Sequence, residues 1–226
     1  MTISDNLITV QNQIREYEKR YGRSPHSVFL LAVTKGQSIK KIEEAIAAGQ
    51  TAFGENYLQE ALPKIHALAN KKIEWHFIGP LQSNKTKKIA EHFSWVHTVS
   101  DKRIATRLND QRSPHLPPLN ICLQVNISEE TSKNGVHFSE ICALSEHCRS
   151  LPRLVLRGLM AIPAPKEHFI EQRAEFYKLY FLYNMLREKG FFIDTLSIGM
   201  SNDVQAAIAE GATIVRIGTA IFGNRT

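Results

Sequence analysis

Short apolar runs alternate with helical segments along almost the whole chain, and this alternation restricts the folds that the chain can adopt. Eight runs are rich enough in apolar or β-branched residues to be buried strands, at residues 28–35, 52–56, 74–79, 95–100, 119–127, 154–162, 195–200 and 213–217. They recur at roughly 25 to 30 residues, the spacing of strand–helix units in a parallel sheet. Eight such units predict an α/β fold, a (β/α)8 TIM barrel.

Helical patterns fill the intervals between the strands. They cover residues 38–48, 57–70, 84–93, 101–112, 139–149, 167–189 and 203–210, and Ser139 is expected to cap the helix that it begins. An extra amphipathic helix at 3–21 precedes the first strand, because its apolar residues recur every three or four positions. A doubly wound open sheet is the alternative fold, but no G-x-G-x-x-G follows the first strand. We predict a single domain, residues 1–226.

The composition is that of a globular protein that lacks covalent or metal cross-links. No apolar run approaches the ~20 residues that span a bilayer. The 3 cysteines form no C-x-x-C pair and the 9 histidines no metal-ligand spacing, so we expect neither disulfides nor a metal site. The N-terminus lacks the pattern of a signal peptide, which with the cysteine usage favours the cytoplasm. A net charge of +6 suits an anionic ligand, although it would also attract nucleic acid nonspecifically.

The first predicted strand ends in a lysine. Counting back from Lys35 in steps of two gives Val33, Leu31 and Phe29, so the amine shares a face of the strand with apolar side chains. Loss of solvation on that face favours the neutral amine, which can attack a carbonyl and form an imine. The alternative is a lysine that only marks the strand end and extends its amine into water. From this strand alone both interpretations stay open.

Other small or polar residues follow predicted strands, where a barrel of this kind carries its active site. Asn56 ends the second strand, and Met200 and Ser201 follow the seventh. Backbone amides near Ser201 and at Gly218-Thr219, after the eighth strand, could bind a phosphate, and the loops after these two strands commonly do so. The alternative roles are a helix cap for Ser201 and a simple turn for Gly218.

Arg216 lies in the otherwise apolar eighth strand. A guanidinium there is costly unless it is paired or hydrogen-bonded. It would face the same side as Gly218, so it could donate to a ligand at the mouth of the barrel. A structural ion pair with a neighbouring strand, for example through Glu55, is the alternative. His76 in the third strand, between Trp75 and Phe77, is expected to pack in the core, with ligand stacking as the alternative.

Long stretches of the chain, in order and over nearly its whole length, resemble the pyridoxal phosphate homeostasis protein family, the single-domain barrels that bind pyridoxal 5′-phosphate (PLP). The matching motifs include Leu-Ala-Val-Thr-Lys at 31–35, Phe-Gly-Glu-Asn-Tyr at 53–57 and Trp-His-Phe-Ile-Gly-Pro-Leu-Gln-Ser-Asn-Lys at 75–85. Further matches are Gln-Val-Asn-Ile-Ser at 124–128, Gly-Leu-Met-Ala-Ile-Pro at 158–163, Ser-Ile-Gly-Met-Ser at 197–201 and Val-Arg-Ile-Gly-Thr-Ala-Ile-Phe-Gly at 215–223. One departure is Gly36-Gln37-Ser38, where the family commonly has a proline-containing turn.

The resemblance implies a role for each candidate residue. It implies that Lys35 forms an imine with PLP, and that Arg216 approaches the pyridine nitrogen. It also implies that Asn56 lies beside the ring, and that the phosphate is held near Met200 by Ser201, Gly218 and Thr219. The fold is expected to be similar to the N-terminal barrel domain of alanine racemases, which carry a further β-domain that this chain is expected to lack.

The resemblance also implies what the protein does. An arginine beside the pyridine nitrogen disfavours its protonation, and an unprotonated ring is a poor electron sink. We therefore expect a cytoplasmic carrier or regulator of PLP, acting in vitamin B6 and amino-acid homeostasis, more than an efficient enzyme. The alternative is a PLP-dependent amino-acid racemase or lyase that uses the same lysine. The expected protein is a monomer that binds neither nucleic acid nor membrane, and transient contact with PLP-dependent or PLP-making enzymes is left open.

Overall fold

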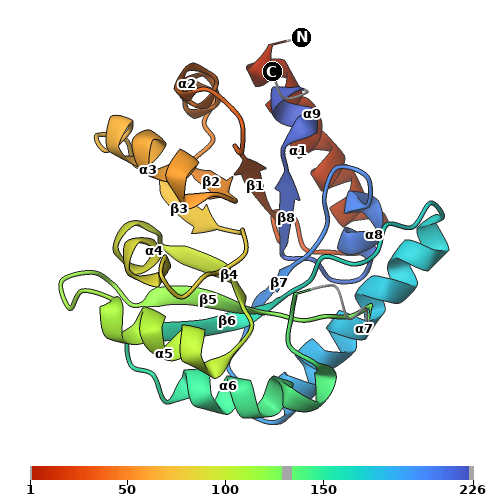
Figure 1. Ribbon diagram of the computed structural model, residues 1–226. Coiled ribbons are helices and arrows are strands. Elements are labelled where there is room, and N and C mark those ends of the chain that lie inside the picture. Colours follow the sequence, from red (N-terminus) through yellow and green to blue (C-terminus); the bar gives the residue numbers. More distant parts are fainter. Residues whose placement is uncertain (1, 129–133, 224–226) are drawn as a thin grey trace.

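The computed structural model describes residues 2–128 and 134–223 (Figure 1). Residues 1, 129–133 and 224–226, which the predicted domain includes, lie outside the described residues. Parallel strands close into a barrel in the order of the chain, and β1 pairs with β8. The strands are β1 (Phe29–Val33), β2 (Ala52–Glu55), β3 (Glu74–Phe77), β4 (Trp95–Val99), β5 (Leu119–Gln124), β6 (Leu154–Met160), β7 (Thr195–Ser197) and β8 (Ile214–Ile217). The predicted (β/α)8 barrel is confirmed.

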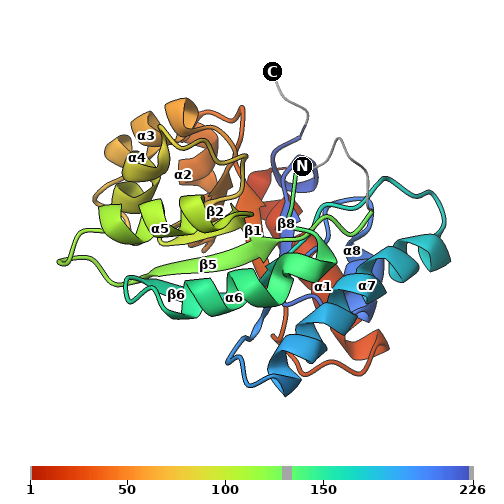
Figure 2. The same ribbon diagram turned by 60° about the horizontal axis from the view of Figure 1, so that its bottom comes forward.

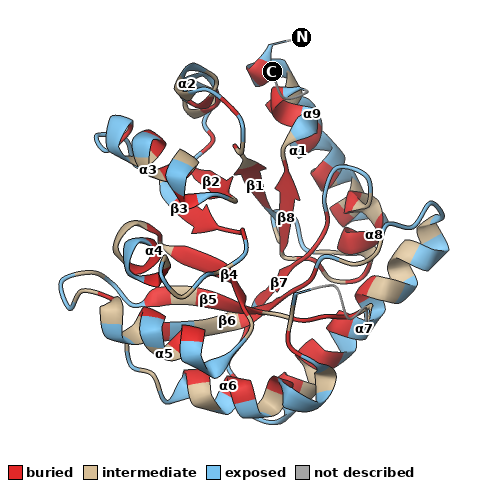
Figure 3. Ribbon diagram, in the orientation of Figure 1, coloured by how far each residue is buried: buried red, intermediate tan, exposed pale blue. Residues whose placement is uncertain are grey.

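Helices surround the barrel, as the side view in Figure 2 shows for α5 and α6 outside β5 and β6. They are α1 (Ile3–Arg20), α2 (Ile39–Ala47), α3 (Leu58–Ala67), α4 (Thr86–His92), α5 (Lys102–Gln111), α6 (Ile141–Arg149), α7 (Phe169–Glu188), α8 (Val204–Ala209) and α9 (Thr219–Phe222). Each helix turns one buried face toward the strands and another toward solvent, whereas the strands are buried almost throughout (Figure 3). This two-sided burial is the reason that the strands read as continuous apolar runs.

Two apolar clusters make up the core. The larger one lies between the strands and the surrounding helices. The smaller one lies inside the barrel and consists of Leu31, Ala52, Ile78, Trp95, Cys122, Met160 and Ile214, with Val33 packed against it. Leu31 and Val33, which share a face of the strand with Lys35, therefore point into the interior of the barrel.

The extra N-terminal helix α1 covers the outside of the barrel next to two short helices, α8 and α9 (Figure 1). It begins with a capping box between Thr2 and Asp5. Near its other end, the buried carboxylate of Glu18 accepts hydrogen bonds from Arg15, at 2.6 Å, and from the backbone N–H of Val28, at 2.7 Å. The helix thus fixes the point at which the chain enters β1.

Three local features differ from the prediction. Ser139 does not cap a helix, because it lies in a 3-10 turn, Phe138–Glu140, and α6 begins only at Ile141. The short helix α9 was not expected, since four residues carry no helical period. Several strands end earlier than predicted, so that Lys35 and Asn56 lie in the loops that follow β1 and β2.

Candidate functional site

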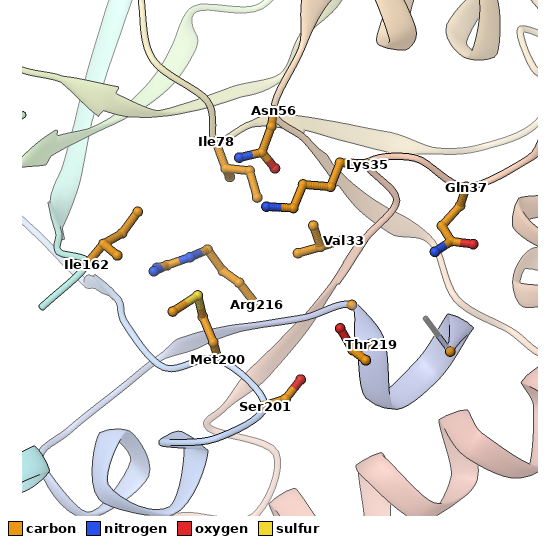
Figure 4. Close-up of a pocket in the computed structure, with 12 residues that line it drawn as sticks. Val33, Lys35, Gln37, Asn56, Ile78, Ile162, Met200, Ser201, Arg216 and Thr219 are labelled. Carbon is orange, nitrogen blue, oxygen red and sulfur yellow. The ribbon is translucent and has the colours of Figure 1, made fainter. Parts of the chain in front are cut away.

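A pocket of about 290 Å³ opens at the carboxyl ends of the strands (Figure 4). It is lined by every site residue that the sequence predicted: Lys35, Asn56, Met200, Ser201, Arg216, Gly218 and Thr219. Five more residues line it that the sequence did not single out: Val33, Gln37, Ile78, Ile162 and Gly223. Lys35, Asn56 and Ile78 lie on one side of this pocket, and Met200, Ser201 and Thr219 lie on the other.

Lys35 is the second residue after β1, and its side chain is partly buried. The loop that follows is tightly bound, although it lacks a proline. Gly36 has a φ of 69°, the left-handed region that favours glycine, and its N–H donates to a carboxylate oxygen of Glu60 at 2.8 Å. The N–H of Gln37 donates to the carbonyl of Thr34 at 3.0 Å. These contacts fix the loop at the base of the lysine side chain.

A buried ion pair on the outer side of the barrel contacts Thr34, the residue before Lys35. Lys64 in α3 donates to Glu55 at 2.7 Å and to the carbonyl of Thr34 at 2.8 Å. The Thr34 hydroxyl donates to the same carboxylate oxygen of Glu55 at 2.6 Å. Burial raises the pKa of Glu55. The hydrogen bonds from Lys64 and Thr34 act in the opposite direction but do not cancel this effect. We call these three residues the outer clamp.

Arg216 is buried in β8 with 4% of its surface exposed. Its guanidinium donates to the carbonyl of Ser197 at 2.5 Å, to the Ser197 hydroxyl at 2.9 Å and to the carbonyl of Ala161 at 3.1 Å. Burial lowers the pKa of Arg216 to about 10, and Asp203 opposes this shift. The alternative ion pair with Glu55 is wrong, because Glu55 faces outward into the outer clamp.

Asn56 contributes an unsatisfied acceptor. Its Oδ1 atom is buried and accepts no hydrogen bond from the described residues. A buried polar atom without a partner costs free energy, so such atoms are few in native structures. Asn56 lines the pocket together with the apolar side chains of Ile78, Ile162 and Met200. The pocket therefore offers apolar walls and a hydrogen-bond acceptor to a ligand.

Two turns line the pocket opposite Asn56. Asp203, not Ser201, is the N-cap residue of α8, and its carboxylate accepts from the N–H of Met200 at 2.6 Å. Ser201 is thus not a helix cap, and its hydroxyl points into the same space as that of Thr219 (Figure 4). A Cβ atom on Gly218 would lie 3.2 Å from the carbonyl oxygen of Val33, a tight contact. The turn after β8 therefore packs closely against the end of β1, and both turns line the pocket.

The remaining sequence expectations concern other parts of the molecule. No group of described His, Cys, Asp and Glu side chains could hold a metal ion. None of the described helices combines the length and apolar character that crossing a bilayer requires. His76 is fully buried and stacks on Trp95 at 5.3 Å between ring centroids, so it packs in the core as expected and does not line the pocket.

Some lining residues carried a weak signal in the sequence. Ile78 directly follows β3, and Ile162 follows β6, so both lie near strand ends where a barrel places its site. Their apolar side chains gave no reason to select them over core residues. Gln37 is buried in the loop after Lys35. The sequence marked this loop only as a departure from the family's proline-containing turn and gave Gln37 no role in the site.

Comparison with known proteins identifies the family. The family model described as "Alanine racemase, N-terminal domain" matches residues 6–226. Pyridoxal phosphate homeostasis protein of Escherichia coli (strain K12) is 52% identical over 226 residues, covering 99% of this chain and 97% of the relative. The protein of that name from Pseudomonas aeruginosa is 53% identical over 224 residues, covering 99% and 96%.

Solved structures agree with this assignment. PipY of Synechococcus elongatus PCC7942 is 34% identical, and the match covers 98% of this chain and 100% of PipY. The TM-score is 0.88 for its structure without PLP and 0.84 for its structure with PLP bound. Both the sequence relatives and this structural relative cover essentially the full length of the chain. The chain therefore belongs to the family of pyridoxal phosphate homeostasis proteins.

Proposed function

We propose that the protein binds PLP in the pocket at the carboxyl ends of its strands, with Lys35 holding it as an imine, and that it acts in intracellular PLP and amino-acid homeostasis. The observation that carries this proposal is the meeting of Lys35, Arg216 and the two turns at Ser201 and Gly218-Thr219 in one pocket. The structure of PipY with PLP bound, at 34% identity over nearly the whole chain, supports it.

The residues present fit the cofactor. PLP carries an apolar ring edged by polar groups, and this pocket combines the side chains of Ile78, Ile162 and Met200 with polar groups around them. The buried Oδ1 of Asn56, which has no partner among the described residues, is an acceptor for a donor on the ligand. A side chain at Gly218 would crowd the carbonyl oxygen of Val33, so glycine lets this turn lie directly against the end of β1.

Each residue has a separate task in this proposal. The amine of Lys35 forms a carbon–nitrogen double bond with the cofactor's aldehyde carbon, and the aldehyde oxygen leaves as water. Backbone amides and hydroxyls at Ser201, Gly218 and Thr219 bind the phosphate. Arg216, whose guanidinium donates to the carbonyls of Ser197 and Ala161, would face the pyridine nitrogen. Asn56 lies beside the ring.

The arginine argues for a carrier and against a racemase or lyase. When bound, PLP supplies an electron-accepting ring, and it does so best with a proton on the pyridine nitrogen. A guanidinium next to that nitrogen disfavours the second positive charge. Among the described residues that line the pocket, there is no Asp, Glu, His, Tyr or Cys that could exchange a proton with a bound amino acid. We therefore propose slow or absent turnover of amino acids.

The proposal extends to the surroundings of the protein. All 3 cysteines are free, which supports a reducing compartment such as the cytoplasm. A carrier has to exchange its cofactor, so transient contact of a monomer with PLP-dependent or PLP-making enzymes is part of the proposal. Mixing the loaded protein with an apoenzyme, and comparing the transfer rate with the rate of spontaneous PLP release, tests this part. A transfer no faster than release would contradict direct contact.

Reduction with borohydride tests the binding mode. After reduction of the loaded protein, peptide mass spectrometry should find the pyridoxyl group on Lys35. The Lys35→Ala variant should lose the visible absorption of the imine and keep its fold, because the residue lies in a loop at the barrel mouth. Lys40→Ala, which removes an exposed lysine five residues away, is the matched control and should bind normally. An adduct on any other lysine would refute the assignment.

A charge reversal tests the carrier against the enzyme. Arg216→Glu should favour a protonated ring and raise any residual turnover of amino acids, whereas the wild-type protein should stay inert. Racemisation by purified wild-type protein at an ordinary enzyme rate of about 10 per second would overturn the carrier assignment. If the variant binds PLP and also stays inert, the missing proton donor is the dominant block.

A further inference from the structure

A row of polar side chains crosses the otherwise apolar interior of the barrel. It begins at Arg216 in the pocket, continues through Ser197 and His97, and reaches His76 and Glu74 at the other end. The donor–acceptor distances along this row are 2.9, 2.8, 2.9 and 2.8 Å. We call these five residues the interior chain.

The interior chain joins strands that are far apart in sequence. Glu74 and His76 belong to β3, His97 to β4, Ser197 to β7 and Arg216 to β8. His76, His97 and Ser197 each have 0% of their surface exposed. Around them lie apolar residues of the inner cluster, among them Leu31 and Met160. Four hydrogen bonds in series through such surroundings are costly to bury unless every donor meets an acceptor.

The two end residues of the interior chain, Arg216 and Glu74, determine the direction of every hydrogen bond in it. A guanidinium can only donate, and an ionised carboxylate can only accept. The hydrogen bond from His76 lowers the pKa of Glu74, so Glu74 is ionised near neutral pH. The Nε2 atom of His76 must therefore carry the hydrogen that it shares with Glu74.

Burial then fixes the remaining hydrogens. It lowers the pKa of both His76 and His97, so both rings are neutral near neutral pH. A neutral ring with a hydrogen on Nε2 has an acceptor at Nδ1, so His76 accepts from Nε2–H of His97. By the same rule His97 accepts at Nδ1 from the hydroxyl of Ser197, whose oxygen accepts from Arg216. All four hydrogen bonds donate in one direction, from Arg216 toward Glu74.

The other charged groups near the interior chain do not change the direction of its hydrogen bonds. At one end, Arg216 interacts through space with Asp203, before α8. The thiol of Cys122 in β5 is neutral, because burial raises its pKa. At the other end, Glu74 interacts with Arg157 in β6. Among the described residues no carboxylate lies within ion-pair distance of Arg216, so its direct partners are neutral oxygens. Its nearest connection to a carboxylate through hydrogen bonds is the interior chain.

We propose that Ser197, His97, His76 and Glu74 are positioning residues of Arg216, and that their ordered hydrogen bonds fix the orientation of its guanidinium beneath the cofactor. Ser197 holds the same guanidinium nitrogen with two acceptors, its carbonyl and its hydroxyl. The hydroxyl is available as an acceptor in a fixed direction only because its hydrogen is committed to His97. This inference rests on the proposed function for the identity of the ligand, but not for the order of the hydrogens.

A merely structural role for the histidines makes a different prediction. His76 stacks on Trp95 with an angle of 5° between the rings, so it also fills the core as an aromatic residue. If packing were its only role, the position of the ring hydrogens would not matter to Arg216. Either tautomer would then serve, whereas the proposal requires hydrogen on Nε2 of both rings.

Nitrogen-15 NMR of histidine side chains in the PLP-free protein tests the order directly. At pH 7 both buried rings should be neutral, with hydrogen on Nε2 and a bare Nδ1. The variants His76→Gln and His97→Gln assign the two sets of signals, and the wild-type spectrum alone contains the answer if a variant does not fold. A ring with hydrogen on Nδ1, or a charged ring, would overturn the proposal. Because no PLP is present, this result is independent of the proposed function.

A hydroxyl deletion and its rescue test the link to the ligand. Ser197→Ala should shift the visible absorption of bound PLP and weaken its binding by about fivefold, the effect of one ordinary hydrogen bond. Ser197→Thr keeps the hydroxyl and should restore both. Met160→Leu, a volume-conserving change in the same inner cluster, is the control that should leave both unchanged. An unshifted spectrum and unchanged affinity in folded Ser197→Ala would refute the positioning role, whereas wild-type protein without any PLP binding would refute the proposed function itself.

Discussion

At the amino-terminal end of the barrel, Arg157 binds Asp194 and Asn120 and lies over the ring of Trp95. At the carboxyl end, Asn56 keeps a buried oxygen without a partner among the described residues. Each end has a cavity of about 290 Å³. The size of the cavity therefore does not distinguish the two ends, and neither does an unpartnered polar atom, because the buried hydroxyl of Ser27 at the amino-terminal cavity also has no partner among the described residues. The difference lies in the charged groups. Arg157 at the amino-terminal end is paired with Asp194, whereas Arg216 at the carboxyl end donates only to neutral oxygens of the described residues.

The two ends also differ in how deeply they bury an ion pair. The side chains of Lys64 and Glu55, in the outer clamp behind Lys35, are 8% and 0% exposed. Those of Arg157 and Asp194 are 32% and 59% exposed. Water screens the second pair, so it contributes little, whereas removing one partner of the first leaves a charge in a place without water.

The largest expected effect is on stability. Lys64→Met should lower the free energy of unfolding by about 3–5 kcal/mol, because it leaves the carboxylate of Glu55 buried without its cation. Asp194→Asn at the other end should cost less than about 1 kcal/mol. Denaturant titration of both variants provides the measurement. The double variant Lys64→Met, Glu55→Gln should recover part of the loss, and equal losses for the two single variants would contradict the comparison.

The next effect concerns the phosphate. Pyridoxal, which lacks it, should bind about 100-fold more weakly than PLP, because the charge-assisted hydrogen bonds at Ser201, Gly218 and Thr219 are not made. Titration followed by absorbance gives both dissociation constants. Thr195→Ala, at the amino-terminal end, should leave this ratio unchanged. Equal affinity of the two ligands would exclude these turns as the phosphate site.

The pH dependence of stability follows from the buried rings of the interior chain. Burial lowers the pKa of His76 and His97 below 6.5, so below pH 6.5 the unfolded chain takes up protons that the folded one does not. Stability should therefore fall as the pH drops through this value, by up to about 1.4 kcal/mol per pH unit for each ring. His97→Gln should make the fall less steep, and the exposed His115→Gln serves as its control. A fall that begins only below pH 5 would be inconsistent with neutral buried rings.

Much of the fold and of the pocket could be predicted from the sequence, because both depend on strand order. In a closed parallel barrel all carboxyl ends meet at one mouth, so residues that follow strands, such as Lys35 and Ser201, come together whatever the details. The direction of Glu55 could not be predicted in this way. A strand that is buried on both faces shows no alternation of polar and apolar residues to indicate which side chains point inward.

The interior chain could not be predicted from the sequence, for a related reason. His76 and His97 are 21 residues apart, and their contact depends on the register between β3 and β4. A single sequence does not reveal the register of two strands that are buried on almost every side chain, because neither shows an alternation of buried and exposed positions. The short helix α9 is too brief to show a period.

The smallest expected effect comes from two glycines, one near each end of the barrel. Gly36, directly after Lys35, has a φ of 69°, and Gly190, after α7 and near the amino-terminal end, has a φ of 81°. An alanine at either position is forced into the left-handed region, so both Gly36→Ala and Gly190→Ala should cost about 1 kcal/mol of stability. A Cβ atom on Gly190 would meet nothing within 4 Å, so that cost comes from the backbone alone.

Gly36 also donates its N–H to Glu60, which fixes the loop that carries Lys35. Any relaxation of the strained loop would therefore move the amine relative to Arg216. We expect Gly36→Ala to slow imine formation and weaken PLP binding several-fold, while Gly190→Ala binds PLP like the wild type at the same loss of stability. If both variants bind PLP equally well, the loop after β1 only closes a turn, and the position of Lys35 is set by the outer clamp.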